Sequence, residues 1–213
     1  DAQGGLVTPG LCDAHAHPLF AGERSAEFAL RAAGRSYREI ADAGGGIMTT
    51  VHATRAATDE QLLAAAQKRL REALAFGTTT MEAKTGYALS IEGEIRLLGL
   101  YAELRARQPI TLVPTLLGTH ALPPEWSHDR ATYVEACAGL MLERAHKLAH
   151  AVDVYCDEGA FTLDETNRIL SAAQAAGFAI RVHAGQFRDL GAAGLVADLG
   201  GLSLGAPEGL ERR

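Results

Sequence analysis

His15 and His17, which are separated by one residue, are the first pair of side chains along this sequence whose spacing suits metal binding. They end an apolar run, residues 6–16, that predicts a strand. Alternate side chains of a strand point to one face, so the two Cα atoms should lie about 7 Å apart with their imidazoles free to converge. Asp13 shares this parity. An isolated pair of this kind also fits two hydrogen-bonded histidines without a metal, so it predicts only part of a site.

His183 is the predicted third ligand, because it follows the apolar run at residues 178–182 and so ends a strand. Three neutral imidazoles leave one coordination position for water, as in catalytic zinc sites. The alternative is a solitary buried histidine. The three histidines together predict a metal centre built from the first and fifth strands.

The elements that must position these side chains alternate along the chain. Short apolar runs alternate with longer stretches of helical periodicity, which is typical of βα units around a parallel sheet. Residues 58–61 and 162–165 each have the form of a capping box, and Gly77 and Gly177 end the helices that these boxes begin. The predicted strands are residues 6–16, 78–82, 110–117, 152–156 and 178–183, with a sixth beginning at Leu202; the predicted helices are residues 58–77, 90–105, 133–150, 162–177 and 190–199.

Both an open doubly wound sheet and a barrel fit this order of elements. The polar residues favour the barrel, because they cluster at the carboxyl ends of strands, where barrels keep their active sites. We therefore expect an α/β fold, namely an incomplete (β/α)8 TIM-type barrel holding about the first five to six βα units. The polar residues at strand ends are His15, His17, Glu82, Lys84, His120, Asp157, Glu158 and His183.

Composition excludes several other classes of protein. The chain has 213 residues, 47% of them hydrophobic, and a net charge of −6, with its basic residues scattered among acidic ones. Nucleic-acid binding therefore has no electrostatic support. No apolar run is long enough to span a bilayer, and we expect a cytoplasmic protein that acts on a small molecule, without nucleic-acid or membrane partners.

Several motifs together resemble one enzyme family. Residues 8–17, TPGLCDAHAH, resemble the segment that carries the first metal ligands in the amidohydrolase superfamily. Further segments resemble the imidazolonepropionase family in order and spacing across nearly the whole chain. These segments are FAGER at 20–24, AGGGI at 43–47, TRAA at 54–57, EAKTGY at 82–87, LGTHALPP at 117–124 and VHAGQ at 182–186.

This resemblance implies hydrolysis of the cyclic amide of 4-imidazolone-5-propanoate to N-formimidoyl-L-glutamate, in histidine degradation, by a metal-activated water. It implies one divalent metal ion, zinc or iron, with His15, His17 and His183 as ligands. It also assigns substrate binding to four residues whose types suit that role, since each offers charge or hydrogen bonds. These substrate-binding residues are Arg24, Tyr87, His120 and Gln186.

Each of these side chains also has an ordinary structural role open to it. Arg24 would be a surface arginine, Tyr87 a packed ring, His120 a solvent-exposed loop residue and Gln186 a residue at a helix entry. Lys84 is a separate case, because a strand-end lysine is carbamylated and bridges two metals in some amidohydrolases. Since the resembled family is mononuclear, we interpret Lys84 as structural, paired with Glu82 or another carboxylate.

The sequence departs from the family at its catalytic base, because Ala206 occupies the position where the family has a histidine. Gly185 replaces a usual acidic residue, and the family's aspartate after the eighth strand is not found. No catalytic residue is thus identifiable. We expect residues 1–213 to be a partial barrel domain, truncated at both ends, without the small β domain and the last barrel units.

Such a chain is expected to be an inactive fragment of an enzyme whose full-length form is a possible homodimer. Two alternatives stay open at this point. One is a related amidohydrolase acting on another cyclic amide or a purine-like ring. The other is a non-catalytic metal-binding remnant.

Overall fold

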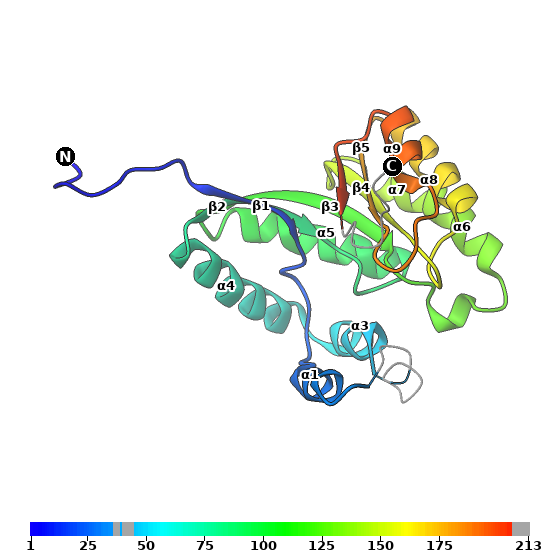
Figure 1. The fold of residues 1–213 in the computed structure, drawn as a ribbon, viewed down its shortest axis with the longest axis horizontal. Helices are drawn as coiled ribbons and strands as arrows, with labels where there is room; N and C mark the ends of the chain where they lie inside the picture. Colours follow the sequence, from blue (N-terminus) through cyan, green and yellow to red (C-terminus); the bar gives the residue numbers. More distant parts are fainter. Residues whose placement is uncertain (36–38, 40–44, 206–213) are drawn as a thin grey trace.

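The computed structural model describes residues 1–35, 39 and 45–205. Within these residues six parallel strands form one sheet in the order of the sequence, each paired with the next (Figure 1). A doubly wound sheet reverses its strand order at a switch point, whereas a barrel does not. The predicted partial barrel is therefore confirmed. The strands are β1 (Leu11–Ala16), β2 (Thr78–Lys84), β3 (Thr111–Thr119), β4 (Ala151–Cys156), β5 (Ala179–Ala184) and β6 (Ser203–Gly205).

The sheet curves strongly, so its first and last described strands approach each other. A Cβ atom added at Gly205 of β6 would lie 2.7 Å from Nδ1 of His15 in β1. This curvature gives the sheet an inner face, toward which side chains from non-neighbouring strands converge. The carboxyl ends of the parallel strands meet at one rim of that face.

Helices cover the outer face of the sheet. In Figure 1, α4 and α5 lie along β1 to β3, α6 to α9 lie beside β4 to β6, and α1 and α3 lie apart, beyond the end of β1. No described helix is long and apolar enough to cross a membrane. The helices are α1 (Ser25–Ala32), α3 (Ile47–Ala56), α4 (Asp59–Ala75), α5 (Ile91–Arg105), α6 (Arg130–Ala138), α7 (Leu140–Ala145), α8 (Leu163–Ala175) and α9 (Ala192–Asp198), with a 3-10 turn at Pro124–Trp126.

Two predicted elements were wrong in extent. The first strand begins at Leu11, where its N–H bonds to the carbonyl of Gly77, while residues 1–10 run away from the sheet and leave Leu6 91% exposed (Figure 1). Strand pairing needs a neighbour, and β2 provides one only from Thr78 onward. The single helix expected at residues 133–150 is two helices, because Gly139 adopts φ −125° and ψ −96°, outside the helical region.

The apolar core lies between the sheet and the outer helices. Leu62 and Leu70 of α4, Leu97 of α5 and Ile169 of α8 are at most 1% exposed and belong to one core cluster. The predicted capping boxes are present at the starts of α4 and α8, at Thr58 and Thr162. A capping box satisfies two backbone N–H groups that the helix itself leaves unpaired.

We expect Thr162→Ala to lower the free energy of unfolding by about 1 kcal/mol. Oγ1 of Thr162 accepts a hydrogen bond from N of Glu165 at 3.2 Å, which alanine cannot replace. Urea denaturation of the two proteins measures the difference. Thr132→Ala is the matched control, since Thr132 is exposed in the first turn of α6 and no side-chain hydrogen bond of it is described. Equal losses from both substitutions would contradict the capping role.

Candidate metal and substrate site

Three histidines from the first and fifth strands of the sheet meet at its rim. His15 lies in β1, His17 just beyond it and His183 in β5, yet their candidate ligand nitrogens all lie within 4.8 Å of one another. The ring centroids of His15 and His183 are 4.3 Å apart. His183 is buried, His17 half-buried and His15 exposed. The cluster predicted from sequence is thus brought together, with one side open to solvent.

The surroundings of His15 and His17 favour neutral imidazoles. Burial, followed by the charge of His183, lowers the pKa of His15 to about 4. Burial also lowers the pKa of His17 well below its ordinary value, followed by the effect of His120. A neutral imidazole offers a nitrogen lone pair, which is what a divalent transition metal needs. The donor set therefore fits a divalent transition-metal ion.

A backbone carbonyl and a carboxylate behind the histidines restrict how the rings of His17 and His183 turn. Nδ1 of His17 lies 3.1 Å from the carbonyl oxygen of Thr85. Nδ1 of His183 lies 2.8 Å from Oδ2 of Asp153. Contacts of this kind at one ring nitrogen leave the other nitrogen for the metal, as outer partners of metal-bound histidines do.

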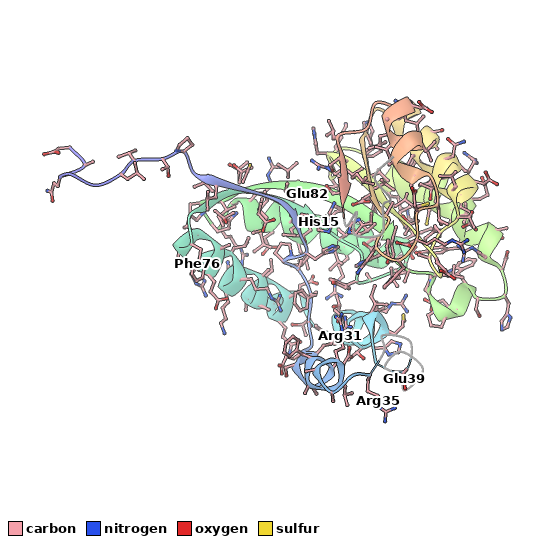
Figure 2. The ribbon with its side chains drawn as sticks, in the orientation of Figure 1. His15, Arg31, Arg35, Glu39, Phe76 and Glu82 are labelled. Carbon is pink, nitrogen blue, oxygen red and sulfur yellow. The ribbon has the colours of Figure 1, made fainter. Side chains whose placement is uncertain are left out.

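Lys84 lies in a buried ionic network next to this cluster. Its Nζ donates hydrogen bonds to Oε1 of Glu82 at 2.7 Å and to Oδ2 of Asp153 at 2.6 Å. Oε1 of Glu82 also accepts from Oγ1 of Thr115 at 2.7 Å and lies 3.0 Å from Nε of Arg181. The expected pairing of Lys84 with Glu82 is confirmed. Figure 2 shows Glu82 and His15 together over the sheet.

Sequence reasoning missed Asp153 and Arg181. Asp153 in β4 and Arg181 in β5 are register partners. Two residues further along these strands, Tyr155 and His183 are partners as well. Alternate residues of a strand share a face, so both pairs lie on the inner face of the sheet. The signal was present, because a charged residue inside a short apolar strand needs a buried partner.

His120 and Tyr87 lie beside the histidine cluster, as a substrate-binding role requires. The ring of His120 stacks on that of His17, with centroids 4.9 Å apart and an interplanar angle of 15°. The ring of Tyr87 lies 5.4 Å from His17 and 5.3 Å from His120. Burial, followed by the charge of His183, lowers the pKa of His120 to about 3. These rings form an aromatic wall adjacent to the three histidines.

The loop that carries Tyr87 is fixed by Glu94 of α5, which sequence reasoning also missed. The Glu94 carboxylate accepts backbone hydrogen bonds from Gly86 at 2.8 Å, Ala88 at 2.9 Å and Leu89 at 2.7 Å. Burial raises the pKa of Glu94, although these hydrogen bonds oppose the shift. A buried carboxyl group with this many donors holds the backbone around Tyr87 in one conformation.

Gln186 lies on an exposed loop after β5. The carboxylate of Asp157 holds this loop, accepting from the backbone N of Gln186 at 2.8 Å and of Arg188 at 3.0 Å. The hydroxyl of Tyr155 donates to Oε1 of Gln186 at 3.1 Å. The ring of Tyr155 lies 6.0 Å from that of His183. Gln186 is therefore held near the mouth of the histidine cluster.

Arg24 lines a pocket. Tyr87 lines the same pocket and also contacts His17 of the histidine cluster. The pocket encloses about 330 Å³. Nε of Arg24 donates to Oε2 of Glu27 at 2.9 Å, and Oε1 of Glu27 accepts from N of Gly46 at 3.0 Å. Ala206, at the expected base position, lies outside the described residues. The residues lining the pocket are Phe20, Gly22, Glu23, Arg24, Thr50, Arg69 and Tyr87.

Comparison with known proteins finds close relatives by sequence. Imidazolonepropionase from Anaeromyxobacter dehalogenans is 52% identical over 204 residues, which cover 94% of this chain and 48% of the relative. Imidazolonepropionase from Myxococcus xanthus is 48% identical over 202 residues, and that from Geobacillus thermodenitrificans is 43% identical over all of this chain and 52% of its own length. The chain thus spans about half the length of these relatives. No family model matches.

Solved structures show a related fold at low sequence identity. A lactonase from Listeria monocytogenes matches 93% of this chain and 61% of its own chain, with a TM-score of 0.52 and 14% identity. A 5-methylcytosine deaminase from Klebsiella pneumoniae, liganded with 5-fluorocytosine, matches 67% of this chain and 33% of its own, with a TM-score of 0.51 and 15% identity. Identities this low support the fold alone.

Proposed function

We propose that this chain, which is 52% identical to one imidazolonepropionase and 43% identical to another and spans about half the length of each, carries the front part of a hydrolase active site. The reaction would open the ring of 4-imidazolone-5-propanoate with water, giving N-formimidoyl-L-glutamate in histidine degradation. The observation that carries the proposal is the convergence of His15, His17 and His183 beside the pocket of Arg24 and Tyr87.

His15, His17 and His183 would hold one divalent ion, either zinc or iron. When bound, such an ion supplies Lewis-acid activation of water and of a ring carbonyl. Asp153 would keep the ring of His183 in one orientation, since its carboxylate lies 2.8 Å from Nδ1. Burial alone would raise the pKa of Asp153, but His183 and Lys84 hold it below its usual range, so the aspartate stays anionic.

The remaining residues would bind the organic substrate. Arg24 suits the propanoate group, because a guanidinium has a planar fork of donors that matches a carboxylate. Tyr87 and His120, packed against His17, would hold the flat ring by stacking and hydrogen bonds. Gln186, on the loop that Asp157 fixes, would form hydrogen bonds with an amide edge of the ring.

Turnover also needs a group that takes and returns a proton, and this chain has alanine at position 206, where the resemblance places that group. We therefore propose that the chain binds metal and substrate but hydrolyses the substrate poorly. General acid–base catalysis contributes about 10²- to 10⁴-fold in rate, so its loss should be plain in an assay.

The test combines metal analysis with a hydrolysis assay on the 213-residue chain. We expect one zinc or iron ion per chain by elemental mass spectrometry. Turnover of 4-imidazolone-5-propanoate should be at least about 100-fold below that of the Anaeromyxobacter dehalogenans relative in the same buffer.

Other outcomes would select a different function. Hydrolysis of another cyclic amide or of a purine-like ring, with no effect on imidazolonepropanoate, would favour a related amidohydrolase. Binding of metal without binding of either compound would favour a metal-binding remnant. Absence of bound metal would contradict the proposal.

A further inference from the structure

Arg69, on α4, reaches into the pocket of Arg24 and is anchored there. Its Nη1 donates hydrogen bonds to the carbonyl oxygens of Pro18 and Phe20, both at 2.9 Å. Its guanidinium carbon lies 3.6 Å from the ring centroid of Phe20, which is cation–π geometry. The guanidinium is thus fixed against the loop that leads from His17 to Arg24.

Glu72, three residues further along α4, is close enough to act on the pKa of Arg69, but it pairs with Lys68 and forms no described ion pair with Arg69. Among the described residues, no acidic side chain forms an ion pair with Arg69, whereas Arg24 is paired with Glu27 at 2.8 Å. Glu23, the acidic residue that lines the same pocket, is exposed to solvent, which screens its charge. Burial lowers the pKa of Arg69 from its ordinary value, but an arginine stays protonated at physiological pH.

These contacts leave a positive charge in the pocket that Arg69 shares with Arg24, with guanidinium donors that the loop carbonyls do not use. A guanidinium has five N–H donors, and the two carbonyls engage a single nitrogen of Arg69. Hydrogen bonds between a guanidinium and a carboxylate are charge-assisted and strong in a partly desolvated pocket. Arg24 alone is a weaker anion receptor here, because Glu27 already engages its Nε and Nη2.

We propose that Arg69 is a specificity-determining residue, whose anchored charge makes the pocket select ring compounds that carry an anionic side chain. This inference rests on the proposed function, because it assigns the carboxylate end of the same substrate site. It adds Arg69 to Arg24, so that the carboxylate would lie between two guanidinium groups. Loss of Arg69 should therefore weaken the binding of anionic ligands, which loss of a purely structural contact with the loop would not do selectively.

The test compares two ligands that differ in the carboxylate. Imidazole-4-propanoate carries it, and 4-propylimidazole does not. We expect Arg69→Met in the zinc-loaded 213-residue chain to weaken binding of imidazole-4-propanoate by about 10-fold or more, measured by calorimetry, and to leave 4-propylimidazole binding unchanged. Arg71→Met is the matched control, since Arg71 is exposed on the same helix.

Two further variants separate charge from loop anchoring. Arg69→Lys retains the charge and should keep most of the affinity for imidazole-4-propanoate, whereas Arg69→Gln retains donors without charge and should lose it. Equal weakening of both ligands in Arg69→Met, or a Gln variant that binds as well as the Lys variant, would overturn the inference and leave only an anchoring role. Unchanged binding in Arg69→Met would overturn it as well.

The same experiment distinguishes this inference from the proposed function. If the unaltered chain binds zinc but neither ligand, both are wrong. If it binds both ligands equally tightly, the site is not selective for anions and the inference fails while a ring-binding function survives. Zinc content and thermal melting of each variant show whether the substitution has changed the fold rather than the pocket.

Discussion

Replacing His183 by alanine should lower the affinity of this chain for zinc by more than about 100-fold. Loss of an outer partner of a metal ligand already costs about 10- to 100-fold in affinity, so loss of a ligand itself should cost more. His183 offers one of three nitrogens that lie within 4.8 Å of one another, and it is the one supplied by β5. Competition with a chromophoric chelator, together with zinc content after gel filtration, measures the change.

His120→Ala is the control that makes this result specific. The ring of His120 stacks on His17 at 4.9 Å, yet it is not one of the three clustered histidines. This variant should keep its zinc and lose affinity for imidazole-4-propanoate. If His120→Ala lost zinc as severely as His183→Ala, the ion would lie on the other side of His17 and the proposed ligand set would be wrong.

Replacing Lys84 by methionine should lower the free energy of unfolding by about 3–5 kcal/mol. Lys84 is 1% exposed and contacts two buried carboxylates, on Glu82 (3% exposed) and Asp153 (1% exposed). Methionine fills a similar volume but leaves these negative charges without their shared cation, and the contacts with Arg181 and His183 compensate only in part. Urea denaturation followed by circular dichroism gives the difference.

Lys68→Met provides the matched control for this substitution. Lys68 is 74% exposed and lies 4.0 Å from Glu72, so its ion pair is a surface contact. Its loss should change the free energy of unfolding by less than about 0.5 kcal/mol. A Lys84→Met protein as stable as Lys68→Met would mean that the inner network contributes little to the stability of the sheet.

Much of the fold could be predicted because its signals are local. A capping box such as that at Thr58 needs residues that are three apart, and Gly77 ends the same helix with φ +95°. The break at Gly139 was missed, because the apolar periodicity continues through it and only the packing of α6 and α7 reveals two helices. The start of β1 was missed because a strand can begin only where its partner strand begins, and β2 begins at Thr78.

Some features of the site could also be predicted from the sequence, whereas others depend on the tertiary structure. The sequence by itself determined that His15 and His17 share a face, since side chains alternate along a strand. Only the tertiary structure decided that Asp153 pairs with Lys84 and that Arg181 pairs with Glu82. It also decided that Arg69 of α4 enters the Arg24 pocket. Those contacts join elements far apart in the chain, so no local spacing records them.

The metal centre depends on both levels. The sequence has histidine at residues 15, 17 and 183, each at or near the end of a predicted strand, and so predicts three imidazole ligands. Whether those ligands meet depends on the curvature of the sheet, which arises from strand twist and from helices packed on one face. That curvature brings β5 toward β1 and places the nitrogens within 4.8 Å, a result that the order of residues alone does not specify.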